Sequence, residues 1–171
     1  MNHQAQAIID ALEMKPHPEG GYYTETYRSD EDIAHQALPE RFPGDRALGT
    51  AIYFLLTSAD ISCFHRIRTD EIWHFYTGSP LDIHLLNTDG GYQKIRMGTD
   101  IANNERPQAV IPHGQWIGAS VVEPDSFTLV GCTTCPGFEF DDFEMADRQC
   151  LLSNYPRHQG IIRRLTGRGG R

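Results

Sequence analysis

Short segments typical of β-strands, separated by turn residues, fill the chain from residue 50 onward and limit its possible folds more than any other feature. Glycine, proline, serine and aspartate gather in the intervals between them, at 78–80, 89–91, 112–114 and 123–125. About eight strands at this spacing predict an antiparallel barrel or sandwich. The expected strands comprise residues 50–57, 61–68, 71–76, 81–87, 92–97, 108–111, 115–123 and 126–133.

The segments on either side differ in composition and are expected to complete a single domain of 171 residues. Apolar residues at helical spacing predict a short amphipathic helix over residues 4–14, which Pro16 and Pro18 terminate. A second helix is expected over residues 144–152. The expected organisation is a helix and turn leader at 1–21, a strand (22–28) and polar loop excursion (29–46) within 22–48, a core barrel at 49–135 and a C-terminal segment at 136–171.

Charge and composition exclude several classes of partner. The 15 basic and 23 acidic side chains give a net charge of -8, which opposes binding to nucleic acid. No apolar run approaches the roughly 20 residues that span a bilayer, and a signal peptide is not recognisable, so we expect a cytoplasmic protein without a membrane partner. The four cysteines are expected to be buried thiols. The arginine-rich tail, with Arg163, Arg164 and Arg168, is expected to be solvated.

A histidine and a glutamate on neighbouring expected strands are the candidate reactive groups. Successive side chains on a strand point to opposite faces, so His65 and Ile67 lie opposite two arginines and should face the interior. The same alternation groups Glu71 with Trp73 and Phe75. A small polar pair within an apolar wall is typical of a pocket for a small molecule.

The spacing of these residues resembles a known family. His65, Glu71 and Gly78 match the first signature of the cupin superfamily, and Pro112 with Gly114 match part of the second. Residues 18–23, 70–75 and 137–144 are similar to segments of a small single-domain group of cupins. The resemblance implies a mainly β protein with the cupin-type double-stranded β-helix, a jelly-roll barrel, carrying a short N-terminal helix and a C-terminal helix.

The resemblance also identifies a departure from the usual cupin metal site. The family's first metal-binding histidine falls on His65 and its acid on Glu71, but its other two histidines fall on Ile67 and Ile117. Isoleucine cannot donate a lone pair, so no tightly bound metal or other cofactor is expected. The alternative is a divalent metal held by His65 and Glu71 with a substitute donor such as Gln108 or His113.

The group is similar in fold to nucleotide-sugar 3,5-epimerases of the RmlC type, which use a histidine base without a metal. This similarity suggests that His65 acts as general base and that Glu71 orients it, on a sugar or nucleotide-sugar type ligand. Two alternatives stay open: a metal-dependent oxygenase or isomerase, and a binding protein without catalysis. The expected ligand-binding residues are Ile67, Trp73, Phe75, Gln108 and Ile117.

Two further expectations concern the outer surface. His74 and His84 flank the turn at 78–80, so a hairpin there would place them opposite one another, packed against a covering element rather than binding a metal. Cupins often cover such a surface with a second copy. A homodimer is therefore expected through the sheet that contains residues 22–27, Ile72, Tyr76 and Leu86.

Overall fold

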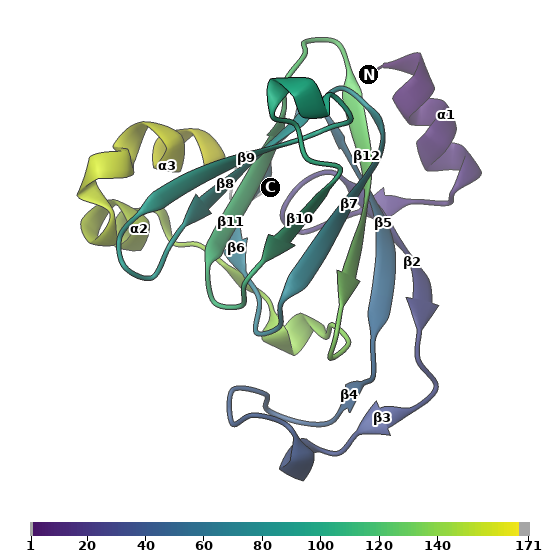
Figure 1. Cartoon of the computed structure of the whole chain (residues 1–171), viewed down its shortest axis with the longest axis vertical. Coiled ribbons are helices and arrows are strands. Elements are labelled where there is room, and N and C mark those ends of the chain that lie inside the picture. Colours follow the sequence, from purple (N-terminus) through teal and green to yellow (C-terminus); the bar gives the residue numbers. More distant parts are fainter. Residues whose placement is uncertain (1, 168–171) are drawn as a thin grey trace.

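Two antiparallel sheets pack face to face in the computed structural model, which describes residues 2–167 (Figure 1). This is the mainly β, cupin-like architecture that the sequence predicted. The six-stranded sheet consists, in spatial order, of β1 (Lys15–Pro16), β2 (Tyr22–Arg28), β5 (Thr50–Thr57), β12 (Phe127–Thr134), β7 (Glu71–Gly78) and β10 (Gln108–Ile111). The five-stranded sheet consists of β13 (Glu144–Met145), β6 (Ser62–Arg66), β11 (Trp116–Val121), β8 (Leu81–Leu86) and β9 (Tyr92–Met97).

Alternating apolar side chains of both sheets meet in the core between them. Trp73 and Phe54 from the larger sheet and Ile83 from the smaller are each at most 2% exposed. Since each strand sends every second side chain inward, the strand pattern of the sequence directly specifies this core. β2, β5, β9 and β10 have the predicted bounds, and the other principal strands differ by a few residues at their ends.

The N-terminal helix α1 (His3–Ala11) covers one end of the outer face of the six-stranded sheet (Figure 1). The Asn2 side chain caps it by accepting hydrogen bonds from two main-chain nitrogens of the first turn. Ala5 and Ile9 are buried against Leu55 and Phe127 of the sheet. The helix ends three residues before the predicted limit at residue 14, ahead of Pro16, which restricts the chain to an extended path.

Two C-terminal helices cover the outer face of the five-stranded sheet, on the left of Figure 1. The predicted helix at 144–152 is wrong in its start, because residues 144–145 pair with β6 and α2 occupies Arg148–Asn154. A further helix, α3 (Gln159–Leu165), replaces much of the expected solvated tail: Ile162 and Leu165 are fully buried against Phe64. Arg168 lies outside the described residues.

Residues 29–46 form an arm that projects from the sandwich (Figure 1). Within it β3 (Asp32–Ile33) pairs with β4 (Arg46–Ala47), and a short 3-10 turn spans His35–Ala37. Further 3-10 turns lie at Ile101–Asn103, Phe140–Asp142 and Pro156–His158. No helix among the described residues is long and apolar enough to cross a bilayer.

The predicted hairpin of His74 and His84 is wrong. The turn at 78–80 carries the chain from the six-stranded sheet to the five-stranded sheet, so β7 and β8 do not pair with each other. His74 lies near Gln108 and Thr133, whereas His84 is buried and contacts Tyr92. The two imidazoles therefore belong to different faces of the molecule.

Candidate functional site

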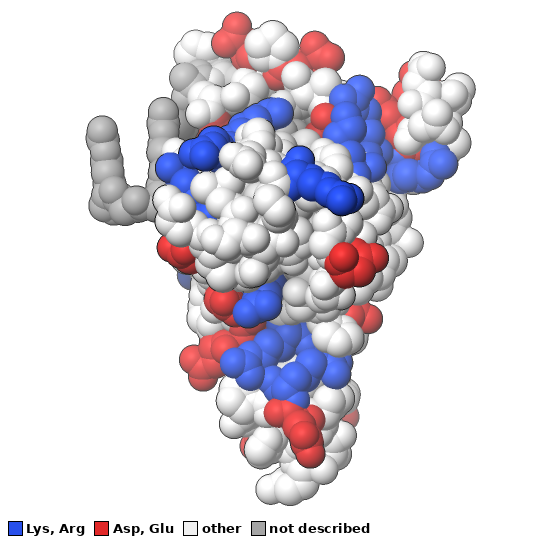
Figure 2. All heavy atoms as spheres, turned by 90° about the vertical axis from the view of Figure 1, so that its left-hand side faces the viewer, with Lys and Arg blue, Asp and Glu red and all other residues white. Residues whose placement is uncertain are grey.

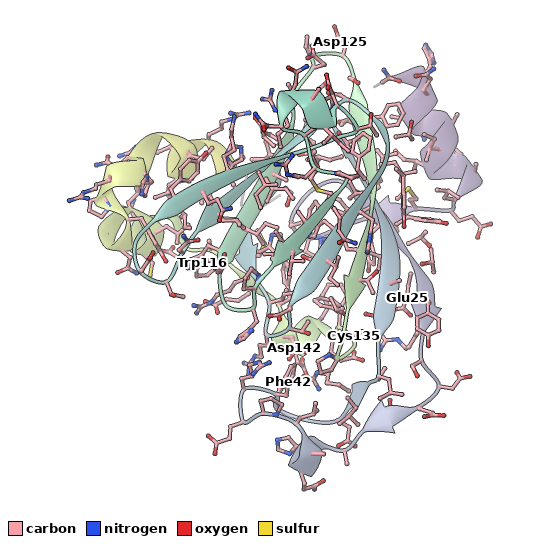
Figure 3. All side chains as sticks on the ribbon, viewed as in Figure 1. Glu25, Phe42, Trp116, Asp125, Cys135 and Asp142 are labelled. Carbon is pink, nitrogen blue, oxygen red and sulfur yellow. The ribbon has the colours of Figure 1, made fainter. Side chains whose placement is uncertain are left out.

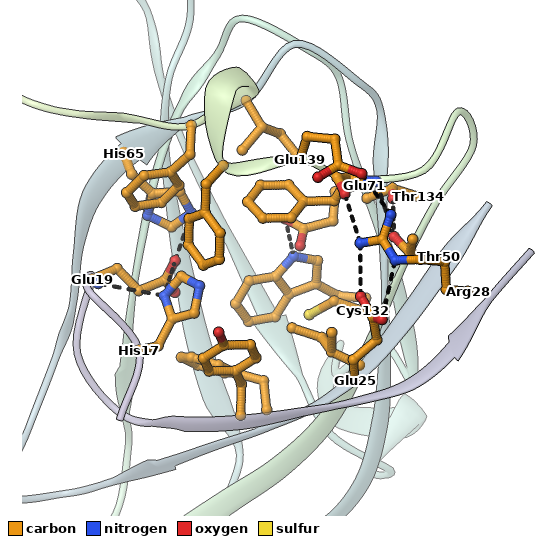
Figure 4. Close-up of a pocket in the computed structure, with 18 of the residues that line it drawn as sticks. His17, Glu19, Glu25, Arg28, Thr50, His65, Glu71, Cys132, Thr134 and Glu139 are labelled. Carbon is orange, nitrogen blue, oxygen red and sulfur yellow. Dashed lines mark hydrogen bonds and ion pairs between the residues drawn. The ribbon is translucent and has the colours of Figure 1, made fainter. Parts of the chain in front are cut away.

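A cavity of about 220 Å³ opens between the two sheets, bounded by the turn that follows β1 and by the segment that follows β12 (Figure 4). Side chains from six strands and three connecting segments, most of them polar or aromatic, converge on it. They are Lys15, His17, Glu19, Tyr23, Glu25, Arg28, Thr50, Ile52, Phe54, His65, Ile67, Glu71, Trp73, Cys132, Thr134, Phe138, Glu139, Phe140 and Phe143.

Four of the predicted site residues lie on this cavity. His65 and Ile67 point into it from β6 and the residue that follows it, as the strand alternation predicted, and Glu71 with Trp73 point into it from β7. The structure thus brings the candidate histidine and the candidate glutamate into one hollow. They are not, however, directly bonded to each other.

The carboxylate in contact with His65 is Glu19, which sequence reasoning did not select. Its Oε2 lies 3.1 Å from His65 Nε2, and its Oε1 accepts a hydrogen bond of 2.8 Å from Ser62 Oγ. A second imidazole, that of His17, places Nδ1 3.2 Å from the same Oε2. Glu19, 5% exposed, is therefore the centre of a buried cluster of two histidines and a serine (Figure 4).

The hydrogen bonds fix the state of His65. Its Nδ1 lies 2.8 Å from the carbonyl oxygen of Cys63, which can only accept, so Nδ1 carries a proton. Nε2 and the facing Glu19 oxygen must then share one more proton. Burial raises the pKa of Glu19, but the charge of His65 and the hydrogen bonds of His17 and Ser62 outweigh it, and the net pKa is lowered. Glu19 is consequently a buried carboxylate whose charge is stabilised by the neighbouring imidazoles and by Ser62.

His17 is the imidazole with a nitrogen available to a ligand. Its Nδ1 faces Glu19, while Nε2 has no hydrogen-bond partner among residues 2–167, and the ring lines the cavity. Tyr23 and Phe143 pack edge-on against it, with ring centroids at 4.7 and 5.6 Å. Nδ1 lies 3.2 Å from the Glu19 carboxylate and 3.4 Å from the Glu19 main-chain nitrogen. In the tautomer that donates from Nδ1 to the carboxylate, Nε2 presents its lone pair to the pocket, which is the arrangement of a general base.

Glu71 lies on the other side of the cavity in Figure 4 and titrates in the opposite sense to Glu19. Trp73 Nε1 donates a 2.7 Å hydrogen bond to its Oε2. Burial raises the pKa of Glu71 more than Trp73 and the charge of His65 lower it. Burial next to Glu71 also raises the pKa of the Cys132 thiol well above its ordinary value, so Cys132 is not a nucleophile.

The mouth of the cavity combines an ion-pair network with an aromatic wall. Arg28 donates to Glu25 at 2.9 Å and to Glu139 at 2.6 Å, and all three line the cavity. The rings of Phe138, Phe140 and Phe143 pack against one another at centroid distances of 5.2 to 6.5 Å. Such a rim offers hydrogen bonds to hydroxyl groups and flat apolar faces to a ring.

Three of the predicted ligand-binding residues do not line this cavity. Phe75 packs against the apolar core, and Ile117 is 1% exposed within it. Gln108 is exposed on β10, 3.3 Å from His74 Nδ1. Glu19 and His17 were missed because they precede the barrel; the signal that could have found them is an acid directly before two glycines, Gly20 and Gly21, in a turn.

The comparisons with known proteins agree with the fold. A sequence model of the family described as Cupin superfamily (DUF985) matches residues 6–146. The chain belongs to this family. Among relatives, the uncharacterized protein YML079W of Saccharomyces cerevisiae is 29% identical over 146 residues, which cover 80% of this chain and 72% of the yeast protein. The matched residues include the whole polar core of the cavity, from His17 to Cys132.

Solved structures extend the comparison. Protein SO0799 from Shewanella oneidensis superposes with a TM-score of 0.85 at 37% identity, over 99% of both chains. A hypothetical protein from Leishmania major has the same TM-score at 31% identity, over 94% of this chain and 97% of that one. Oxalate decarboxylase from Bacillus subtilis matches at 13% identity and a TM-score of 0.53, over 90% of this chain and 37% of the enzyme, and shares the fold alone.

The residues at the usual cupin metal positions do not fit a metal. Ile67 and Ile117 place hydrocarbon where the family's histidines stand, and both are buried. The retained His65 directs its nitrogens to Cys63 and Glu19, and Glu71 accepts from Trp73. Within residues 2–167, no group of three or more histidine, cysteine, aspartate or glutamate side chains is arranged to hold an ion.

Proposed function

We propose that this cupin binds a small sugar-like molecule and moves a proton on it, as an isomerase or epimerase does, without a metal. The observation that carries the proposal is the pair of buried carboxylates whose pKa values are shifted in opposite directions within one cavity. Opposed shifts of this kind make one carboxyl lose its proton more readily and the other retain it more readily, which gives the site a basic and an acidic side.

His17 is the base in this proposal, in place of His65. In the tautomer with its proton on Nδ1, which faces the Glu19 carboxylate at 3.2 Å, His17 directs the lone pair on Nε2 at the ligand. His65 stabilises the negative charge of Glu19 and does not itself receive the proton that leaves the ligand. His17 removes a proton from a carbon next to a carbonyl, and the resulting enolate oxygen is stabilised by hydrogen bonding.

Glu71 is the acid. Its carboxyl group, whose pKa burial raises, returns a proton from its protonated form to the other face of the same carbon, and proton exchange of His17 and Glu71 with solvent restores the starting state. Atoms balance without an oxidant or a reductant. The cavity of about 220 Å³ is smaller than the ~300–1,000 Å³ of pockets for drug-sized ligands, so it suits a single ring.

The test is proton exchange with solvent. The protein is incubated in deuterated water with keto sugars and nucleotide sugars, and deuterium at carbon is followed by NMR. Uptake is expected for the wild type, with a loss of about 10²-fold or more in His17→Asn and in Glu71→Gln. Ligand-induced thermal stabilisation without deuterium uptake would reduce the proposal to binding.

A matched variant separates the roles of the two histidines. His65→Gln should lower the exchange rate less than His17→Asn, because His65 acts through Glu19. If both variants fold normally and lose the exchange rate equally, His65 would be the base. Elemental analysis of the purified protein completes the test: stoichiometric iron, zinc, manganese or nickel would contradict chemistry without a metal.

A further inference from the structure

A second hollow, of about 370 Å³, lies beside the cavity where the arm meets the end of β6. Arg41 of the arm and Arg66 and Arg68 of the β6 segment line it. Figure 2 displays basic side chains gathered on this side of the molecule, above the tapering arm. Ile67 and Phe143 line both hollows, so the two spaces are adjacent.

Arg41 and Arg68 hold each other in place without a carboxylate between them. Arg41 Nε donates to the carbonyl oxygen of Arg68 at 2.8 Å, and Arg68 Nη1 donates to the carbonyl oxygen of Arg41 at 2.6 Å. These reciprocal bonds order both guanidinium groups, and their other N–H groups make no hydrogen bond within the described part of the chain, although Arg68 Nε lies 3.9 Å from Asp142. Ordered, free donors of this kind cost little entropy when they bind an anion.

The carboxylates around the hollow are mostly engaged elsewhere. Both oxygens of Asp142 accept from Arg46, at 2.6 and 2.7 Å, and Arg68 Nε is 3.9 Å from that carboxylate. Glu144 pairs with Arg66 at 2.8 Å. Asp141 alone lines the hollow without an ion pair among the described residues. Two neighbouring guanidinium groups thus share at most one free carboxylate, and an anion between them would relieve their repulsion.

We propose that this hollow, the Arg41–Arg68 cleft, binds a phosphoryl group. The oxygens of a phosphate match two planar guanidinium groups better than the oxygens of a single carboxylate do. Because the cleft adjoins the cavity, it would hold the charged part of a phosphorylated ligand whose ring enters the cavity. That last clause rests on the proposed function, whereas anion binding by the cleft does not.

Pyrophosphate is the probe, titrated into the full-length protein by calorimetry at low ionic strength. Arg68→Ala and Arg41→Ala should each weaken binding about tenfold, as expected for loss of one charge-assisted hydrogen-bonding group. Arg68→Lys, which retains the charge but not the planar guanidinium group, should weaken pyrophosphate binding less. Asp141→Asn should tighten binding, because it removes the competing charge. Arg157→Ala, an exposed arginine on the C-terminal segment, is the matched control and should bind as the wild type does.

Three outcomes would overturn the proposal: no saturable binding below about 10 mM pyrophosphate, equal losses in Arg157→Ala and Arg68→Ala, or no gain in Asp141→Asn. Urea denaturation of each variant establishes that it is folded. Pyrophosphate binding in a protein that exchanges no deuterium would support the cleft and contradict the proposed chemistry. Exchange without pyrophosphate binding would do the reverse.

Discussion

Glu19 and Glu71 contribute to stability over different ranges of pH, although they line the same cavity. The pKa of Glu19 is lowered in the folded state, so its stabilisation is present above the ordinary value of 4.5 and is lost as pH falls through the lowered pKa. The pKa of Glu71 is raised, so its contribution is present below 4.5 and is lost as pH rises through the raised pKa. Near neutral pH, Glu19 stabilises the fold and a charged Glu71 opposes it.

The first prediction follows from this contrast. Glu19→Gln should lower the free energy of unfolding at pH 7 by about 3 kcal/mol, because it removes the buried carboxylate that two imidazoles and Ser62 contact. Glu71→Gln is the matched control: the amide oxygen can still accept from Trp73, and no charge has to be buried. It should leave stability unchanged or increase it. Urea denaturation of both variants is the measurement, and a larger loss in Glu71→Gln would contradict the assignment.

His84 is expected to make the protein sensitive to acid. The imidazole is 3% exposed, Nδ1 lies 2.8 Å from the Tyr92 hydroxyl, and Nε2 has no hydrogen-bond partner among residues 2–167. Burial, with the charges of Arg164 and Lys94, lowers its pKa from 6.5 to about 4 against the opposing charge of Asp82. The unfolded chain binds the proton more readily, so stability is full above pH 6.5 and decreases as pH falls towards 4.

The decrease should amount to about 3 kcal/mol. His84→Phe keeps the stacking on Tyr92 but cannot be protonated, so it should remove this part of the pH dependence. Unfolding by urea at several pH values between 7 and 4 compares the two proteins, and parallel curves would refute the role of His84. His158, whose ring lies 5.4 Å from that of Tyr92, provides a control through His158→Phe, which should retain the wild-type slope.

At the residue scale, the sequence predicted the cavity residues that lie on strands and missed those that lie in the turn before β2. The inward direction of His65 followed from alternation on a strand, whereas that of Glu71 followed from the resemblance to the cupin signature. Glu19 depends on a tertiary contact, in which its carbonyl oxygen accepts from Cys63 N at 2.8 Å and docks the turn onto β6. Gly20 and Gly21, with φ of 112° and 70°, allow the chain to make that turn. No local periodicity reports such a contact.

Helices and strands were predictable from the sequence where turn residues mark their ends. Alternation does not specify which strands pair, so the turn between β7 and β8 was read as a hairpin although it joins two sheets. The C-terminal helices were underestimated because their apolar residues are few, and Ile162 and Leu165 are buried only by the sheet beneath them. Tertiary packing, rather than helix propensity, stabilises these short helices.

The arm supplies a prediction at the scale of elements. Arg46 at its root makes two hydrogen bonds to Asp142, with both side chains at most 4% exposed, beside the buried Phe42 (Figure 3). Asp142→Ala leaves the Arg46 charge buried and unpaired, so it should lower the free energy of unfolding by about 3–5 kcal/mol. The arm should also become more susceptible to trypsin at Arg41. The exposed neighbour Asp141 gives the control, since Asp141→Ala should change neither measurement.

At the scale of the whole molecule, the outer faces of the two sheets differ in how much of each the chain's own helices cover. The expectation that a second copy covers Leu86 is wrong, because the protein's own C-terminal helices pack on it. The outer face of the six-stranded sheet is covered only at one end, by α1. Beyond that helix, Tyr27, Tyr76 and Val110 are 57%, 50% and 53% exposed. The sequence predicted apolar outer positions, but only packing determines which of them the chain itself covers.

We therefore expect a homodimer through the uncovered part of this face, which β2, β5, β12, β7 and β10 provide. A stable interface buries roughly 800 Å² per partner, with aromatic residues near its centre. Val110→Lys should shift the protein from dimer to monomer in light scattering at micromolar concentration, because a charge without a partner would be buried at the interface. Gln93→Lys, on the exposed surface of β9, adds the same charge away from the interface and should remain dimeric. A monomeric wild type, or dissociation of both variants alike, would exclude assembly through this sheet, and the exposed tyrosines would then need another partner.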